Sequence, residues 1–171
     1  GNMKNLKSLN VLNGELSLPV EIGDLSNLKT LSLVGIGLKT VPPEIGKLTN
    51  LEDLQIGSNG LNFLSTEIGN LSKLKKLSIN NNNLSTLPKS FGNLKNLEEL
   101  FLTANPFTSL PDELKNLTKI TKLDFRSSQM KHIPMAVFGM TNLIDLNFTN
   151  CQLTSIPPEI KNLKKLQNLN V

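Results

Sequence analysis

The chain has 171 residues, a length that fits one domain of ordinary size. Its 18 basic and 14 acidic residues give a net charge of +4, too mild by itself to indicate nucleic-acid binding, which needs a concentrated basic stripe. The single cysteine excludes an internal disulfide, and no run of 18 apolar residues is present, so we expect no transmembrane helix.

A single unit recurs along the chain. Its copies begin at Leu6, Leu28, Leu51, Leu74, Leu97, Ile120, Leu143 and Leu166. The first interval is 22 residues and the other six are 23 residues each. The unit reads L-x-x-L-x-L-x-x-N-x-L-x-x-L-P-x-x-I-x-x-L-x-x, and residues 97–119 are one full copy. Such a period is typical of solenoids, in which one unit cannot bury its apolar face alone and neighbouring units stack.

The first residues of each copy predict a β-strand. In residues 97–102 apolar residues alternate with outward-facing ones, so Leu100 and Leu102 face inward. Glu99, Phe101 and the following Thr103 face outward. Strands one repeat apart can pair only in parallel, because the chain has to return between them.

The rest of each copy predicts a turn and a short return leg. The side chain of Asn105 can bond backbone groups of its own turn and of the neighbouring one. Pro111 fixes φ at the start of the return leg. Leu114 and Leu117 lie three residues apart, which predicts a short helical or 3-10 turn with its apolar side inward.

Several copies depart from this pattern. The Asn position is occupied, in chain order, by Gly14, Ile36, Asn59, Asn82, Asn105, Ser128 and Cys151. Because Gly14 and Ile36 cannot form the side-chain bonds, we expect the first two turns to be looser or reshaped. In the third copy, Leu64-Ser65 replaces the Leu-Pro junction.

The unit resembles the leucine-rich repeat family, in particular its typical and Ras-group repeats, through the 23-residue length and the Leu-Pro-x-x-Ile segment over residues 3–171. The resemblance implies an α/β solenoid: a right-handed horseshoe with a parallel β-sheet on the concave face and 3-10 turns and loops on the convex face. We expect one domain over residues 1–171, with seven repeats and partial ends. Because no polar cap covers either end, we expect a piece of a longer chain or self-association through the uncapped ends.

No group of residues indicates catalysis, a metal or a cofactor. We expect His132 to be solvated in a surface loop, and Cys151 to be a small structural residue in its turn. We therefore predict that this chain is not an enzyme. Asn-x-Ser/Thr triplets occur at Asn70, Asn83, Asn116 and Asn147, but the repeat pattern itself produces them, so we do not expect glycosylation there. The sequence does not decide the cellular compartment, although it slightly favours the cytoplasm over a secreted or surface location.

The outward strand residues should line the concave face. One row carries alternating charges in successive copies: Asp53, Lys76, Glu99, Lys122 and Asp145. Parallel strands lie about 4.8 Å apart, so opposite charges are neighbours in this row. We expect pairing between repeats rather than a site for a charged ligand.

Two outward residues are not explained by the repeat pattern. Phe101 is the only aromatic residue of the outward rows, and Arg126 is the only arginine of the chain against 17 lysines. Either Phe101 contacts a partner, or Arg126 lies over its ring in a cation–π contact. We predict a partner site at Phe101, Asp124 and Arg126, flanked by Ser78, Asn80 and Thr103.

The function that this sequence favours is a non-catalytic module that binds a protein partner on its concave face. One alternative is a surface or secreted recognition protein, since the face is rich in Asn, Ser, Thr and Gln, which suit a glycan or a host ligand. Another is the recognition arm of a larger enzyme, such as a kinase or a ubiquitin ligase.

Overall fold

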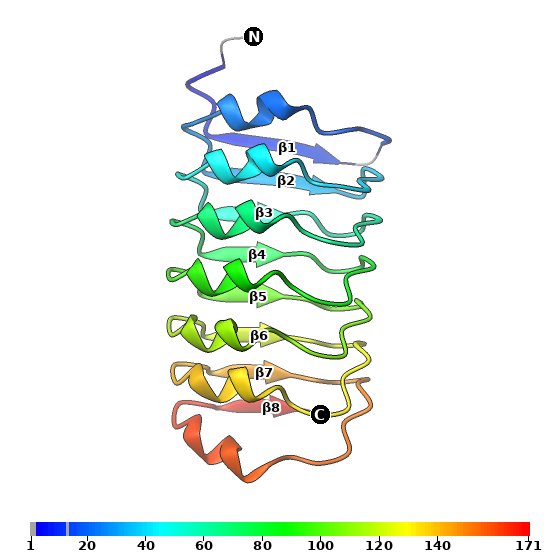
Figure 1. The fold of residues 1–171 in the computed structure, drawn as a ribbon, viewed down its shortest axis with the longest axis vertical. Coiled ribbons are helices and arrows are strands. Elements are labelled where there is room, and N and C mark those ends of the chain that lie inside the picture. The colour runs from blue at the N-terminus through cyan, green and yellow to red at the C-terminus, as the bar shows by residue number, and fades with distance from the viewer. Residues whose placement is uncertain (1–2, 13) are drawn as a thin grey trace.

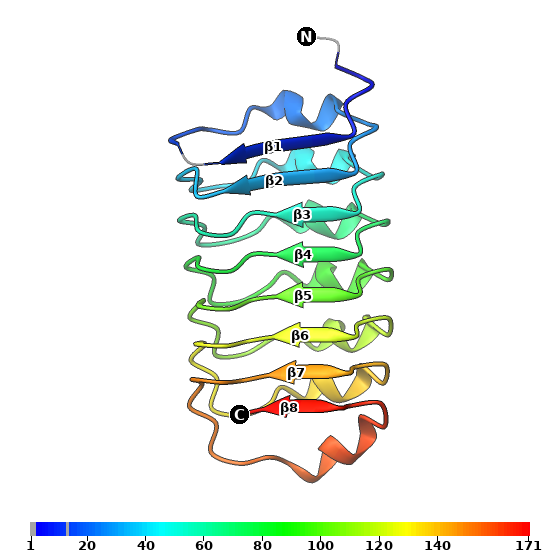
Figure 2. The ribbon, with the colours of Figure 1, turned by 180° about the vertical axis from the view of Figure 1, so that it is seen from behind.

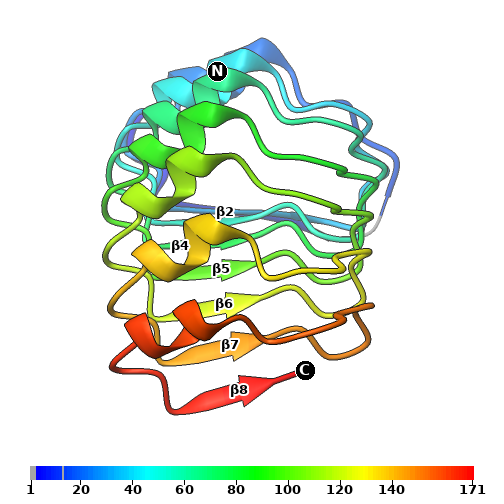
Figure 3. The same ribbon diagram turned by 60° about the horizontal axis from the view of Figure 1, so that its bottom comes forward.

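The protein is a stack of parallel strands and 3-10 turns in a computed structural model, which describes residues 3–12 and 14–171. Each repeat contributes one strand and one return leg, so the element order is a regular alternation from β1 to β8 (Figure 1). Figure 3 shows the sheet and the row of 3-10 turns as two layers, joined by connecting segments along both sides. The predicted solenoid is confirmed.

The strands form one sheet in which the order in space equals the order in sequence. They are β1 (Ser8–Leu12), β2 (Thr30–Val34), β3 (Asp53–Gln55), β4 (Lys76–Ser78), β5 (Glu99–Phe101), β6 (Lys122–Asp124), β7 (Asp145–Asn147) and β8 (Asn168–Asn170). Every neighbouring pair is parallel, and residues one repeat apart face each other, such as Leu77 and Leu100 (Figure 2). This register keeps each inward leucine over the leucine of the preceding repeat.

Each return leg contains a five-residue 3-10 turn, as the spacing of Leu114 and Leu117 predicts. These turns are η1 (Val20–Asp24), η2 (Pro43–Lys47), η3 (Thr66–Asn70), η4 (Lys89–Asn93), η5 (Asp112–Asn116), η6 (Met135–Gly139) and η7 (Pro158–Asn162). The proline of the junction precedes the turn with an extended backbone, as at Pro111, where φ is −67°. Ser65 adopts nearly the same backbone, with φ of −66°, so the third copy keeps the turn without its proline.

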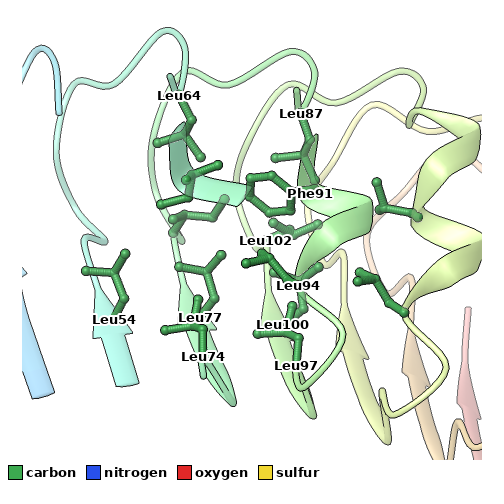
Figure 4. Packing of buried hydrophobic residues seen from close by; sticks show 14 of the residues in the cluster. Leu54, Leu64, Leu74, Leu77, Leu87, Phe91, Leu94, Leu97, Leu100 and Leu102 are labelled. Carbon is green, nitrogen blue, oxygen red and sulfur yellow. The ribbon is translucent and has the colours of Figure 1, made fainter. Parts of the chain in front are cut away.

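The core is the interior between the sheet and the return legs. Leucines at the central strand position are 0% exposed from the second to the seventh strand: Leu31, Leu54, Leu77, Leu100, Leu123 and Leu146. Figure 4 shows Leu77 and Leu100 pointing from adjacent strands into the interior that also holds Phe91 of η4. Aromatic side chains contribute more than the composition suggests, because Phe125 and Phe148 are fully buried and stack with ring centroids 5.1 Å apart.

Asparagines close the turns of the middle repeats. Asn105 is 1% exposed; its side-chain oxygen accepts the N–H of Leu84, and its side-chain amide donates to the carbonyls of Ile79 and Leu102. Asn59 and Asn82 form equivalent bonds to their own and the preceding repeat. These bonds satisfy backbone groups that the turns would otherwise bury unpaired.

The first two turns are reshaped, as Gly14 and Ile36 lead us to expect. Strands β1 and β2 run for five residues instead of three, and their pairing extends to Leu12 and Val34. Ile36 is buried as a core residue between Gly35 and Gly37, whose φ angles of 67° and 72° are readily adopted by glycine.

Stacking also explains why glycines recur at the 23-residue interval in the return legs. A Cβ added at Gly46 would lie 2.5 Å from the carbonyl oxygen of Glu67 in the next turn. The glycine therefore lets adjacent 3-10 turns pack against each other, and it is not part of a phosphate-binding loop.

Candidate partner-binding surface

The outward strand side chains form rows across the sheet, because the register aligns equivalent residues. In one row Asp53, Lys76, Glu99, Lys122 and Asp145 are register neighbours. In the next row Phe101 lies between Ser78 and Asp124. The sheet therefore places the predicted charge row and the predicted partner site beside each other.

The charge row pairs less completely than we predicted. Within residues 3–12 and 14–171, its only salt bridge joins Lys76 and Glu99, with 3.7 Å between Nζ and Oε2. Asp53 instead accepts a hydrogen bond from the Gln55 side chain of its own strand, and Asp145 accepts one from Asn168. A carboxylate on a short strand has polar neighbours in both directions, so alternation of sign alone does not decide the partner.

Phe101 is partly buried, and a different cation from the predicted one covers its ring. The Nζ atom of Lys76, on the preceding strand, lies 5.6 Å from the ring centroid. The alternative in which Arg126 covers the Phe101 ring is therefore wrong, since the Arg126 guanidinium is bound to Asp124. Lys76 was predicted only as a member of the charge row, although its position, diagonal to Phe101 on the adjacent strand, could have indicated this contact.

Asp124 and Arg126 form a close ion pair within one repeat. Arg126 Nη2 lies 2.8 Å from Asp124 Oδ2, and Nε lies 3.1 Å and 3.0 Å from the two carboxylate oxygens. Asp124 Oδ1 also accepts the backbone N–H of Arg126 at 3.0 Å. The Asp124 side chain is 9% exposed and that of Arg126 is 51% exposed. The hydrogen bonds to Asp124 raise the pKa of Arg126, so its charge is fixed and presented at the surface.

The three flanking residues of the predicted site are joined by Asn80. Its amide donates to Ser78 Oγ at 3.1 Å, and its oxygen accepts the backbone N–H of Thr103 at 2.8 Å. Among the described residues, none forms a hydrogen bond with the buried Thr103 hydroxyl. The structure thus brings Ser78, Asn80 and Thr103 together as a hydrogen-bonded group beside Phe101.

A shallow depression lies on the same face toward the C-terminus. It is lined by Lys122, Leu123, Asp124, Asp145, Leu146, Asn147 and Asn170. Of the predicted site residues only Asp124 lines this depression, so Phe101 and Arg126 lie outside it.

An ion triad that we did not predict lies at the side of the sheet, just before the strands. Glu52 Oε2 is 2.8 Å from Lys75 Nζ, and Glu52 Oε1 is 2.9 Å from Lys29 Nζ. The hydrogen bonds from Lys75 and Lys29 lower the pKa of Glu52 from 4.5 to about 2, and the bond to Glu52 raises the pKa of Lys75. The signal for this triad was present in the sequence, since the three residues occupy one repeat position in successive copies.

The two other side chains considered as candidates for chemistry, Cys151 and His132, form ordinary contacts with the repeats. Cys151 donates through Sγ to the carbonyl of Phe125 at 3.2 Å, as an asparagine would at that position. His132 is exposed, with Nδ1 3.4 Å from Thr154 Oγ1. The described residues contain no group of three or more His, Cys, Asp or Glu side chains that could hold a metal ion, and no helix among them is long and apolar enough to cross a bilayer.

Comparison with protein families gives two matches. A model described as a leucine-rich repeat region matches residues 1–101, and a model of the leucine-rich repeat itself matches residues 96–117 and 142–163. Comparison with curated proteins gives no match.

Solved structures with the same architecture include proteins of bacteria and plants. A leucine-rich repeat protein of Leptospira interrogans is 31% identical, with a TM-score of 0.54 over 98% of this chain and 56% of that one. The ectodomain of the Arabidopsis thaliana receptor kinase GASSHO1/SCHENGEN3, in complex with Casparian strip integrity factor 2, is 28% identical with a TM-score of 0.76, over 98% of this chain and 24% of that one.

The similarity to internalin C2 of Listeria monocytogenes concerns the fold alone. It is 23% identical, with a TM-score of 0.83 over 99% of this chain and 73% of that one. This chain spans about half the length of the Leptospira protein and about a quarter of the receptor ectodomain.

Proposed function

Because this chain belongs to the leucine-rich repeat family, we propose that it is a non-catalytic protein-interaction module that binds its partner on the concave face. The surface that we assign to the partner is centred on Phe101 and on the Asp124–Arg126 ion pair. Ser78, Asn80 and Thr103 flank this centre.

The observation that carries the proposal is the combination of side chains around Phe101. An aromatic ring, a lysine and a charged arginine belong to three successive repeats, and the side chains of Lys76 and Arg126 stay 43% and 51% exposed. Aromatic and arginine residues are enriched among the residues that dominate binding energy at protein interfaces. A partner that displaces Lys76 would gain access to the Phe101 ring.

The surface is held in place before binding. Asp124 orients Arg126 through three side-chain contacts and one backbone bond, and Asn80 links Ser78 to Thr103. Side chains that are already ordered lose little entropy on association, which favours affinity. The receptor ectodomain that shares this fold is in a complex with Casparian strip integrity factor 2, which is consistent with an interaction role for the fold.

The polar character of the face supports a glycan ligand less well than a protein partner. Both ends of the Asn80 side chain are bonded within the sheet, and Asn147 Oδ1 accepts the backbone N–H of Thr149 at 2.9 Å. Amide groups used in this way are less available to sugar hydroxyls. Phe101 is also the only aromatic side chain in the outward rows, whereas sugar sites commonly use several aromatic platforms.

The proposal is tested by the double substitution Phe101→Ala, Arg126→Ala. Candidate partners are first captured on the immobilised chain, and the Kd of each purified partner is then measured by isothermal titration calorimetry. Loss of two central interface residues should weaken binding at least about 30-fold, which corresponds to roughly 2 kcal/mol. The melting temperature is measured as well, and the Kd is compared well below it, because Arg126→Ala leaves the Asp124 carboxylate with only its backbone bond.

A matched control removes the same kinds of side chain from another surface. Lys39 and the 57%-exposed Phe63 lie on the connecting segments that follow the strands, so Lys39→Ala, Phe63→Ala should leave the Kd within about twofold. Equal weakening by both double variants, or none by the first, would refute the concave-face site.

A further inference from the structure

We propose a second interaction surface: the side of the solenoid where the chain enters each strand binds an extended acidic segment of a protein. This basic flank comprises the turn residues that precede the strands, 3–7, 25–29, 48–52, 71–75, 94–98, 117–121, 140–144 and 163–167. It does not include the concave-face residues assigned above, so the two proposals stand independently.

The flank concentrates the positive charge of the protein. It holds nine lysines and two glutamates, a formal charge of +7, and the rest of the chain therefore carries −3 against the net charge of +4. All nine lysines are exposed: Lys4, Lys7, Lys29, Lys73, Lys75, Lys95, Lys119, Lys164 and Lys165. The flank runs along the left side of Figure 1 and the right side of Figure 2, where each strand begins. A mild net charge thus conceals a strongly basic stripe.

Three of these lysines are held in a line by asparagines. The ammonium groups of Lys73, Lys119 and Lys165 donate to the side-chain oxygens of Asn50, Asn96 and Asn142 at 2.7, 2.7 and 2.6 Å. The amide of each asparagine is bonded in turn to a backbone carbonyl of the preceding repeat, those of Ser26, Ser72 and Thr118. The line is therefore ordered by the backbone and presents one fixed ammonium group in every second repeat.

The spacing of this line matches an extended polypeptide. Two repeats correspond to two strand separations, about 9.6 Å. A polyproline II chain rises about 3.1 Å per residue with three residues per turn, so every third side chain lies on the same side at about 9.3 Å. Glutamates at every third position of such a segment would each meet one of the fixed ammonium groups. A shallow depression accompanies the line; its lining residues are Glu98, Lys119, Thr121, Asn142, Ile144 and Lys165.

Other polyanions fit the flank less well. It contains no arginine and no aromatic residue in any of its ranges, so it lacks the planar forks and stacking platforms that strengthen nucleic-acid binding. Met3 is its only exposed large apolar side chain, so little of it could insert into a lipid surface. Point charges at a regular pitch favour a linear carboxylate ligand.

The test measures binding of a fluorescent peptide of four Glu-Pro-Ser units, about 37 Å long in polyproline II form, by anisotropy at low salt. We expect saturable binding that weakens as salt is added, and no binding of the matched Gln-Pro-Ser peptide. The variant Lys73→Gln, Lys119→Gln, Lys165→Gln should bind at least tenfold more weakly. The control Lys47→Gln, Lys115→Gln, Lys161→Gln changes the net charge equally on η2, η5 and η7, and should bind within twofold of the unmodified protein.

Several results would overturn the proposal. The first is that the Glu-Pro-Ser peptide does not bind, and the second is that both triple variants weaken its binding equally. The third is that a single-stranded oligonucleotide or phosphatidylserine vesicles bind more tightly than the peptide at matched charge concentration. The Phe101→Ala, Arg126→Ala variant should bind the peptide normally, so failure of either proposal can be recognised separately.

Discussion

The middle repeats and the first two repeats close their turns by different means. In the middle, Asn59, Asn82 and Asn105 reach across to the preceding repeat, and the strands are three residues long. In the first two, the asparagine is missing, the strands extend to five residues, and glycines turn the chain. The same backbone requirement is thus met by side-chain bonds in one region and by a longer ladder with glycine turns in the other.

The two regions meet at Asn59. Its side-chain oxygen accepts the N–H groups of both Ile36 and Leu38, at 3.1 and 3.0 Å, in the second repeat. An asparagine therefore satisfies the turn of the repeat before it as well as its own. Asn59 thus supplies side-chain bonds to the turn of the second repeat, where Ile36 is a core residue.

The largest difference in stability between the two regions should come from substituting the buried strand leucine. Leu100→Ala removes a fully buried side chain in the middle of the stack and should cost about 2–5 kcal/mol of unfolding free energy. Leu9→Ala, at the equivalent position of β1, removes a partly buried side chain and should cost about 1 kcal/mol. Urea denaturation followed by circular dichroism measures both, since the chain has no Trp or Tyr. Equal costs would contradict the burial difference.

The second largest loss of stability should come from removing a turn asparagine. Asn105→Ala leaves the N–H of Leu84 and the carbonyls of Ile79 and Leu102 without this partner, and should cost about 3 kcal/mol, since each unsatisfied buried group costs roughly 1–3 kcal/mol. Cys151→Ala removes a weak sulfur donor to the carbonyl of Phe125 and the contact with Ser128 Oγ, and should cost about 1 kcal/mol. Thermal unfolding of the two variants distinguishes them. A cost for Cys151→Ala as large as that for Asn105→Ala would show that the cysteine fully replaces the asparagine.

A smaller effect is expected from the left-handed residue that precedes each turn asparagine. Ala104 has φ of 53°, a conformation that costs a non-glycine residue about 1–2 kcal/mol, while glycine loses more entropy on folding. Ala104→Gly should therefore stabilise the protein by about 0.5–1 kcal/mol. Gly35→Ala, at the equivalent position with φ of 67°, should destabilise it by a similar amount. The two melting temperatures should move in opposite directions, and a shift in the same direction would argue against this explanation.

The smallest effect concerns Glu52, whose salt bridges to Lys29 and Lys75 connect the second repeat to the middle ones. Its folded-state pKa of about 2 lies below the ordinary 4.5, so its contribution is fully present above pH 4.5 and is lost as the pH falls toward 2. The stability difference between the unmodified protein and Glu52→Gln should shrink over that range. Salt should also reduce it at neutral pH, because the triad is exposed.

The matched control for this prediction is Glu98→Gln. Glu98 is exposed on the same flank and forms no salt bridge within residues 3–12 and 14–171. Its substitution removes an exposed carboxylate of the same flank without removing a salt bridge, so it should lower the stability at neutral pH less than Glu52→Gln does. Parallel pH profiles for Glu52→Gln and the unmodified protein would contradict the role of the triad.

The limits of the sequence-based predictions are clearest at Phe101. Its outward position followed from the alternation of the strand. One of the two alternatives placed Arg126 over its ring, but the cation there is Lys76. Both are diagonal neighbours, so spacing alone could not separate them. Asp124 keeps Arg126 away from the Phe101 ring, because it lies two residues from Arg126 and binds its guanidinium in a close ion pair.

The sequence by itself determined the repeat period, the buried face of each strand, the 3-10 return leg and the turn asparagines. A residue in a solenoid has its counterpart one repeat away as its neighbour, so a linear period translates directly into contacts. Only the tertiary structure decided which of several nearby charged side chains form pairs. It also decided which lysines of the basic flank are held in a line by hydrogen bonds to asparagines. Those choices depend on side-chain rotamers and on competition among groups at similar distances, which the period does not specify.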